Sequence, residues 1–276
     1  MSIRFSVASP DGTAVRRLIR LGSKKGSMNG ISERLDGIRK RVEAACARAG
    51  RDAAEVSLLA VAKTFGPDEV REAADCGLTV IGESRIQEAR QKIPLCPGHL
   101  QWHMVGHVQR NKVRDVAQLF SMVHSVDSWK LLEAVNGACQ DAGRVMPVCL
   151  EVNVSGERSK FGLAPEEVPA VLEPCGSLAN VEVVGLMTIP PFTEDPEDAR
   201  PFFRRLRGLR DEWRDRHGLP LRELSMGMSH DFEAAVEEGA TWIRVGTLLF
   251  GERPRKPKDP DDVPPEDEAA RGQETI

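Results

Sequence analysis

A lysine stands at the end of the first strongly apolar run of the chain, Val-Ser-Leu-Leu-Ala-Val-Ala-Lys (56–63). An amine that is partly removed from water loses its proton more readily, and the neutral amine can form a Schiff base with an aldehyde. Lys63 is therefore a candidate nucleophile. Taken alone, its position fits better with the common alternative, in which the side chain extends its ammonium group to solvent.

Two later segments have the composition of anion-binding loops. Residues 225–229 (Ser-Met-Gly-Met-Ser) end an apolar run and precede a helix-like stretch, and residues 244–247 (Arg-Val-Gly-Thr) end the next run. Glycine allows backbone N–H groups to approach an anion closely, and a following helix N-terminus favours negative charge. If these loops lie beside Lys63, the site suits a phosphorylated aldehyde.

The elements that must position these residues follow a regular alternation. Eight short apolar runs alternate with helix-length segments, which predicts the α/β class and a single (β/α)8 TIM-type barrel. The alternative is a doubly wound open sheet, but no G-x-G-x-x-G follows the first run. In a barrel the first and eighth strands are neighbours, and functional groups gather where strands end. The predicted strands lie within 56–63, 78–83, 100–106, 120–127, 146–154, 181–189, 221–227 and 241–247.

The barrel is predicted to span residues 28–252. Apolar residues recur at helical spacing from Ile31, and Gly50 closes this first helix. Residues 1–27 are basic and are expected to be a disordered extension. Residues 253–276 are rich in proline and charge, with little to bury, and are expected to be a disordered tail.

Composition narrows the class of function. The 276 residues carry a formal net charge of −4, which argues against a general nucleic-acid binder and favours a small-molecule partner. No apolar run is long enough for a transmembrane helix. The six cysteines form no C-x-x-C pair, so we expect reduced thiols in a cytoplasmic protein.

Two other clusters have simpler explanations. His103 and His107 are four residues apart, but they follow a strand pattern, in which that spacing corresponds to about 13 Å. We therefore predict no metal site. A group of arginines is followed by acidic residues on the same segment, which predicts a solvated helix face. These arginines are Arg204, Arg205, Arg207 and Arg210.

Seven segments together resemble the YggS/PROSC family of homeostasis proteins, which bind pyridoxal 5′-phosphate (PLP). The family shares the barrel domain of alanine racemases, a PLP fold type III-like barrel, here without the C-terminal β domain of those enzymes. The segments are LLAVAKT (58–64), IGESRIQEA (81–89), WHMVGHVQRNK (102–112), HSVD (124–127), EVNVSGERSKFG (151–162), GLMTIP (185–190) and LSMGMSHDFEAAVEEGATWIRVGTLLFG (224–251).

The resemblance implies the role of each site residue. Lys63 would carry PLP as a Schiff base, Arg244 would face the pyridine nitrogen, and the phosphate would be held by Ser229, Gly246 and Thr247. The chain departs from the family at two positions. Ser84 stands where the family has asparagine in G-E-N, and Phe65 stands where a further lysine is often found.

Three functions remain open at this stage. The first is a carrier that buffers PLP or delivers it to apo PLP-enzymes, acting as a monomer or weak dimer without significant turnover. The second is an amino-acid racemase. Alanine racemases use a tyrosine as the second acid/base, and this sequence contains no tyrosine. The third is a lysine Schiff-base aldolase that needs no cofactor. Arg244 favours the carrier because a guanidinium has only hydrogen-bond donors and cannot accept a proton. Facing the ring nitrogen, it would keep that nitrogen unprotonated and make PLP a weaker electron sink.

Overall fold

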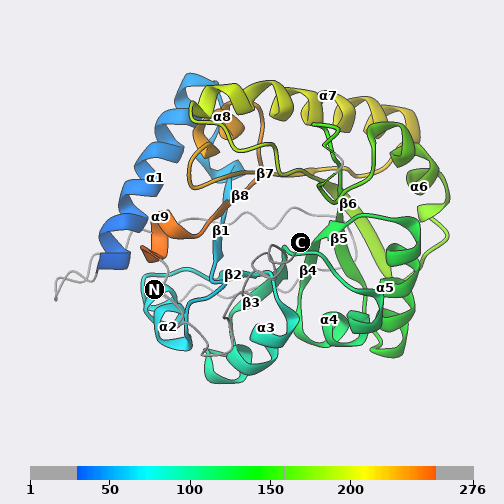
Figure 1. Cartoon of the computed structure of the whole chain (residues 1–276), viewed down its shortest axis with the longest axis horizontal. Coiled ribbons are helices and arrows are strands. Elements are labelled where there is room, and N and C mark those ends of the chain that lie inside the picture. Colours follow the sequence, from blue (N-terminus) through cyan, green and yellow to red (C-terminus); the bar gives the residue numbers. More distant parts are fainter. Residues whose placement is uncertain (1–29, 158, 253–276) are drawn as a thin grey trace, which may run out of the picture.

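The computed structural model describes residues 30–157 and 159–252. The predicted extension at 1–27 and the predicted tail at 253–276 lie outside these residues. The described chain forms a closed barrel of eight parallel strands surrounded by helices (Figure 1). The barrel prediction is confirmed. The strands are β1 Ser57–Val61, β2 Val80–Glu83, β3 Gln101–Met104, β4 Met122–Val126, β5 Met146–Glu151, β6 Val181–Met187, β7 Glu223–Met228 and β8 Trp242–Val245.

Helices follow each strand and cover the outside of the barrel. One additional helix, α1 (Gly30–Arg48), precedes β1 and packs beside α8 and α9 (Figure 1). The others are α2 Pro67–Asp75, α3 Ile86–Lys92, α4 Val113–Leu119, α5 Trp129–Asp141, α6 Val168–Cys175, α7 Arg200–His217, α8 Phe232–Glu237 and α9 Thr247–Phe250. Short 3-10 turns are η1 Ala53–Glu55, η2 Ile93–Leu95, η3 Arg110–Lys112, η4 Pro165–Glu167 and η5 Pro196–Ala199. Among the described residues, no helix is long and apolar enough to cross a membrane.

Alternation along each strand divides the core into an outer layer and an interior. On β1, Ala60 and Ala62 join the large cluster between strands and helices, whereas Leu59 and Val61 belong to a separate cluster with Trp242. Successive strand residues point to opposite faces. Lys63 has the same parity as Leu59 and Val61, so the chain directs it to the inner side at the end of β1.

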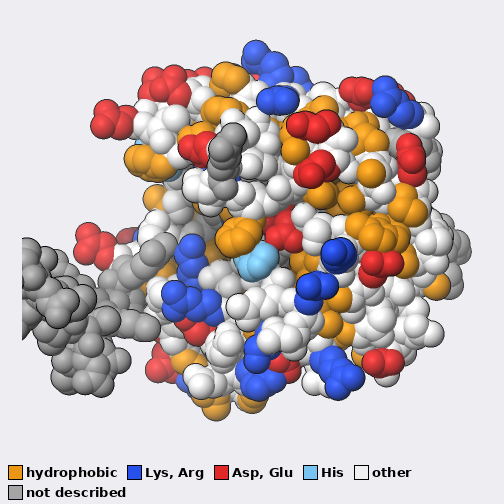
Figure 2. All heavy atoms as spheres, turned by 45° about the vertical axis from the view of Figure 1, so that its right-hand side comes forward, with side chains coloured by type: hydrophobic (Ala, Val, Ile, Leu, Met, Phe, Trp, Pro, Cys, Tyr) orange, Lys and Arg blue, Asp and Glu red, His pale blue; other side chains and the backbone are white. Residues whose placement is uncertain are grey.

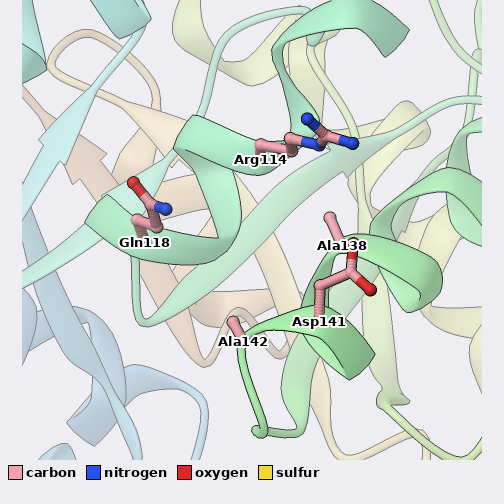
Figure 3. A pocket seen from close by; sticks show the side chains of 5 residues that line it. All are labelled: Arg114, Gln118, Ala138, Asp141 and Ala142. Atoms are coloured by element: carbon pink, nitrogen blue, oxygen red, sulfur yellow. The ribbon is translucent and has the colours of Figure 1, made fainter.

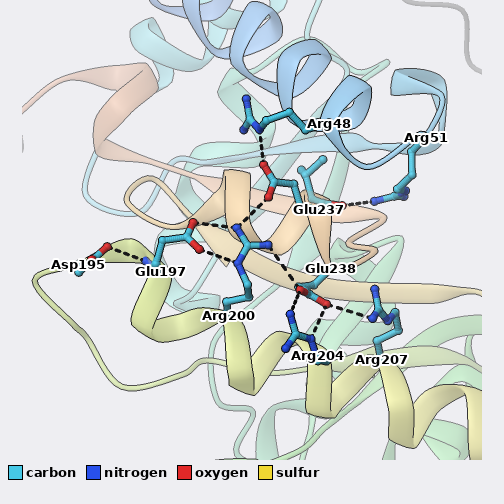
Figure 4. A network of polar contacts seen from close by, with 10 residues as sticks. Arg48, Arg51, Asp195, Glu197, Arg200, Arg204, Arg207, Glu237 and Glu238 are labelled. Carbon is cyan, nitrogen blue, oxygen red and sulfur yellow. Dashed lines mark hydrogen bonds and ion pairs between the residues drawn. The ribbon is translucent and has the colours of Figure 1, made fainter.

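A network of ion pairs fixes the short helix α8 to its neighbours (Figure 4). Glu238, which follows α8 and is only 6% exposed at its side chain, pairs with Arg200, Arg204 and Arg207 of α7. Glu237 pairs with Arg48 of α1. Arg204 and Arg207 remain 62% and 37% exposed at their side chains, in keeping with the predicted solvated face of α7, but the sequence did not predict their shared partner Glu238. The network anchors the segment between β7 and β8.

The surface carries no uniform charge on the face shown in Figure 2, where acidic and basic side chains are intermingled. A pocket on the outer wall lies between α4 and α5 (Figure 3), away from the strand ends that form the mouth. It is lined by Arg114, Gln118, Ala138, Asp141 and Ala142. All six cysteines are unpaired, and Cys46, Cys139, Cys149 and Cys175 are buried.

Closure of the barrel requires β6 and β7 to approach closely at Gly185. A Cβ atom there would lie 2.0 Å from the carbonyl oxygen of Glu223, so the strands would have to separate. We expect Gly185→Ala to lower the free energy of unfolding by about 3 kcal/mol or more, the upper range for overpacking.

Gly137→Ala is the matched control for this substitution, since nothing lies within 4 Å of the added Cβ. In the interior of helix α5 this change should stabilise by roughly 0.5–1 kcal/mol. Urea unfolding of both variants measures the difference. Equal stabilities would show that the close approach at Gly185 does not constrain the barrel.

Candidate functional site

The five residues expected to form the site all belong to neighbouring strands. Lys63 follows β1, Ser229 follows β7, Arg244 lies within β8, and Gly246 and Thr247 come directly after β8. β8 pairs with both β1 and β7, and Leu59 is aligned with Arg244. The fold therefore brings these residues to one side of the mouth, as the sequence predicted. Whether they perform the roles implied by the family stays a prediction.

The hydroxyl of Ser229 marks a point where backbone N–H groups converge. Its oxygen accepts hydrogen bonds from the amides of Gly246 (3.3 Å) and Leu248 (3.4 Å). A Cβ at Gly246 would lie 3.2 Å from the carbonyl oxygen of Val61, so glycine permits this loop to approach β1. Thr247 begins α9 and is exposed. The arrangement can offer two amides and two hydroxyls to an anion.

Arg244 is a buried cation whose hydrogen-bond partners among the described residues are all neutral. Its guanidinium donates to the carbonyl oxygen of Ser225 (2.7 Å), the hydroxyl of Ser225 (2.9 Å) and the carbonyl oxygen of Thr188 (2.8 Å). Only 5% of the residue is exposed. Among the described residues, none accepts a hydrogen bond from its Nε–H. That donor remains available to a ligand.

The hydrogen bonds continue from Arg244 into the barrel through two histidines. The Ser225 hydroxyl lies 2.8 Å from Nδ1 of His124, and Nε2 of His124 lies 3.0 Å from Nδ1 of His103. Burial, followed by the charges of His103 and Arg244, holds the pKa of His124 well below its usual value. His124 is therefore neutral at neutral pH.

The direction of this chain follows from Arg244, because a guanidinium can only donate. Ser225 accepts from Arg244, and its own hydrogen has only Nδ1 of His124 as an acceptor among the described residues. His124 must then carry its proton on Nε2 and donate it to Nδ1 of His103. The sequence did not predict the contact of His124 with Ser225, because the two residues lie 101 positions apart.

Helix α3 holds the backbone on which Lys63 is mounted. Lys92 donates to the carbonyl oxygen of Ala62 (2.7 Å) and forms an ion pair with Glu83 (2.6 Å). Both charged side chains are buried, with exposures of 7% and 0%. Glu88, one turn earlier on α3, accepts a hydrogen bond from the amide of Thr64 (3.0 Å). The residues on both sides of Lys63 are therefore fixed by α3.

The backbone after Lys63 adopts a strained conformation. Thr64 has a φ of 71°, which β-branched residues rarely adopt. The hydrogen bond from its amide to Glu88 stabilises this turn. The next residue, Phe65, is buried against the ring of Phe250, with 5.0 Å between the ring centroids. Phe65, which replaces a lysine common in the family, therefore joins the Lys63 turn to α9 as part of the core.

The opposite side of the mouth carries acidic groups that sequence reasoning did not select. Glu151 ends β5 and is 7% exposed. Its pKa is raised to about 7, mainly by burial and also by the charge of Asp127, against the opposing charge of Arg244. Asp127 in turn lies 2.9 Å from Nδ1 of His107, whose ring stacks on Phe161.

The two histidines with metal-like spacing have separate partners. His103 contacts His124 inside the barrel, whereas His107 contacts Asp127 at the mouth. Within the described ranges 30–157 and 159–252, no group of three histidine, cysteine or acidic side chains could hold a metal ion. Ser84, the other departure from the family, donates its amide to Glu83 (2.8 Å).

The buried ion pair beneath Lys63 can be tested directly. Lys92→Met leaves the Glu83 carboxylate buried without its partner, so we expect a loss of about 3–5 kcal/mol in unfolding free energy. Adding Glu83→Gln should recover part of this loss because it removes the unpaired charge. Urea unfolding of the single and double variants measures both values. Strictly additive losses would contradict the pairing.

Comparison with known proteins identifies related sequences. Residues 34–254 match the family model of the alanine racemase N-terminal domain. The chain is 46% identical to the pyridoxal phosphate homeostasis protein of Aquifex aeolicus, over 80% of this chain and 97% of the relative. Identity to the human protein of that name is 40%, over 85% of this chain and 90% of the relative.

Solved structures with a similar fold include a relative of this chain and a more distant enzyme. PipY of Synechococcus elongatus, determined with PLP bound, has a TM-score of 0.71 and 36% identity, covering 80% of this chain and all of PipY. An alanine racemase from Clostridium difficile shares only the fold, with a TM-score of 0.60 and 15% identity over 80% of this chain and 58% of the enzyme. The family resemblance is thus confirmed: the chain belongs to the pyridoxal phosphate homeostasis proteins.

Proposed function

We propose that this protein binds PLP at the mouth of its barrel and buffers or delivers the cofactor without turning over amino acids. The main observation in support is that the half-buried Lys63 lies on the same side of the mouth as the amides that converge on Ser229 and as the buried Arg244. Lys63 would hold the aldehyde carbon covalently. Ser229, Gly246 and Thr247 would bind the phosphate, and Arg244 would face the pyridine nitrogen.

The residues present fit this cofactor. The Nε–H of Arg244 is a donor with no acceptor among the described residues, and a pyridine nitrogen is an acceptor. The amides of Gly246 and Leu248 already converge on an oxygen atom, that of Ser229. α3 holds the backbone at Ala62 and Thr64, which limits the freedom of the intervening Lys63.

The same contacts argue for a carrier rather than a racemase. PLP supplies an electron sink for amino-acid chemistry when its ring nitrogen is protonated. Arg244 can only donate, and its supporting chain through Ser225 and His124 is neutral, so no described contact of Arg244 offers that nitrogen a proton. The tyrosine used by alanine racemases is absent from all 276 residues.

The remaining parts of the proposal concern partners. Apo PLP-enzymes are the expected acceptors of the cofactor, and the protein is expected to act in the cytoplasm as a monomer or weak dimer. The exposed position of Thr247 supports exchange, since this residue of the proposed phosphate site is accessible to solvent.

Lys63→Ala should abolish covalent PLP binding. The wild-type protein should absorb visible light after incubation with PLP, and borohydride should fix a pyridoxyl group on Lys63, detected by peptide mass spectrometry. Lys160→Ala is the matched control, because Lys160 also follows a strand end but pairs with Glu157 (2.6 Å). Modification of another lysine in the wild type would refute the assignment.

Measurements of PLP delivery and of amino-acid turnover distinguish a carrier from a racemase. Loaded protein should reactivate an apo PLP-enzyme at a rate different from that of an equal concentration of free PLP. The same sample incubated with L- and D-alanine should show no racemisation above free PLP. Racemisation with a turnover number of about 1–10³ s⁻¹, abolished by Lys63→Ala, would identify an enzyme instead.

A further inference from the structure

A buried carboxyl group without a partner lies at the mouth of the barrel. Glu151 has a well-fixed backbone: its carbonyl accepts a hydrogen bond from the amide of Leu163 (2.8 Å), and it aligns with Met187 on β6. Its side chain, in a residue only 7% exposed, makes no hydrogen bond or ion pair with any described residue. Burial of such a group is unfavourable unless something else supplies a partner.

The strand pattern directs this carboxyl inward. Val148 and Leu150 of β5 pack in the outer cluster between strands and helices. Cys149 belongs instead to an interior cluster with Met122. Glu151 has the parity of Cys149, and Arg244 of β8 acts on its charge from across the barrel. Its carboxyl therefore faces the space above Arg244.

The anchors of the proposed function determine which edge of PLP faces β5. The phosphate arm and the aldehyde occupy adjacent ring carbons, and the ring nitrogen lies two atoms from the carbon that bears the arm. The residues proposed to bind these three groups come from β7, β8 and β1, on one side of the mouth. The ring hydroxyl lies on the opposite edge, and β5 is opposite β1 in the closed order of strands.

We propose that Glu151 binds the ring hydroxyl of PLP through a single shared proton, an inference that rests on the proposed function. No covalent step is involved. When the ring oxygen is ionised, the protonated carboxyl donates to it, and when the ring oxygen is protonated, the carboxylate accepts. Two anionic oxygens would repel one another in this buried position, because little water is present to screen their charges. The bound state therefore keeps one proton between them.

The electrostatic surroundings support this role. The pKa of Glu151 is raised to about 7, mainly by burial and also by the charge of Asp127 just after β4, while the charge of Arg244 opposes this increase. The carboxyl consequently holds its proton below about pH 7 and can donate. An ionised ring oxygen placed beside it would raise the pKa of Glu151 above this value, because like charges disfavour ionisation.

The test compares PLP with an analogue that lacks only the ring hydroxyl. Dissociation constants for both are measured by absorbance titration of the full chain, for the wild type, Glu151→Ala, Glu151→Gln and Glu157→Gln. Glu157 is the matched control, since it lies in the loop after β5 and pairs with Lys160 at the surface. Glu151→Gln keeps the size of the side chain and a permanent donor.

The preference for PLP over the analogue should fall about tenfold in Glu151→Ala relative to the wild type, the effect of losing a hydrogen bond to a charged group. Glu151→Gln and Glu157→Gln should retain the preference. In the wild type the preference should also decline as the pH rises above 7, because the shared proton is lost, whereas in Glu151→Gln it should not change with pH. The ratio of the two dissociation constants removes the contribution of phosphate ionisation, which both ligands share.

An unchanged preference in Glu151→Ala, or the same pH dependence in Glu151→Gln as in the wild type, would overturn the inference. Should the alanine variant fail to fold, the pH comparison with Glu151→Gln decides the question. Failure of the proposed function looks different: wild-type protein would then form no covalent PLP adduct on Lys63 at any pH.

Discussion

The parallel pairing of β1 with β8 is the constraint on which the site depends. Four consecutive residue pairs, from Ser57–Trp242 to Ala60–Val245, join strands from opposite ends of the sequence. This register places Arg244 level with Leu59, inside the barrel, while Lys63 extends beyond β1 to the mouth. A shift of one residue would turn Arg244 to the outer face. The separation between Lys63 and the buried Arg244 is thus a consequence of strand register.

Four buried ionisable groups beneath the mouth are accommodated in three different ways. Lys92 and Glu83 neutralise one another directly and hold the backbone before Lys63. Arg244 is solvated by neutral acceptors and keeps a donor available. Glu151 has no partner among the described residues and takes up a proton instead. Only the first arrangement is complete in the protein alone, and the other two leave hydrogen-bonding capacity directed toward a ligand.

In the proposed function, the hydrogen bonds that support Arg244 account for a site that binds PLP and restrains its chemistry. Arg244, Ser225, His124 and His103 form a chain of hydrogen bonds that runs in one direction, so in the proposed arrangement a proton could pass from the chain to the ring nitrogen only if every hydrogen bond reversed. The hydrogen bonds that orient Arg244 therefore also limit what the cofactor can do. Rigidity at Lys63 and exposure at Thr247 are compatible with capture followed by release.

The sequence by itself determined the barrel, its eight strands and the side of the mouth where the five selected residues meet. It could do so because the apolar alternation is local, and because a closed parallel barrel places every strand end on one face. Each observed strand lies within its predicted run except at Met228, one residue beyond 221–227. Most other ends are shorter than predicted, because the chain leaves the hydrogen-bonded ladder there.

Only the tertiary structure decided which polar groups face one another. The bonds of His124 to Ser225, Lys92 to Ala62 and Arg204 to Glu238 join residues that are distant in sequence, and no periodicity marks them. Glu151 is an equally clear case, since in the sequence it is one more polar residue after an apolar run. Its unusual state arises from burial and from the charges that the closed barrel places around it, and these are properties of the assembled fold.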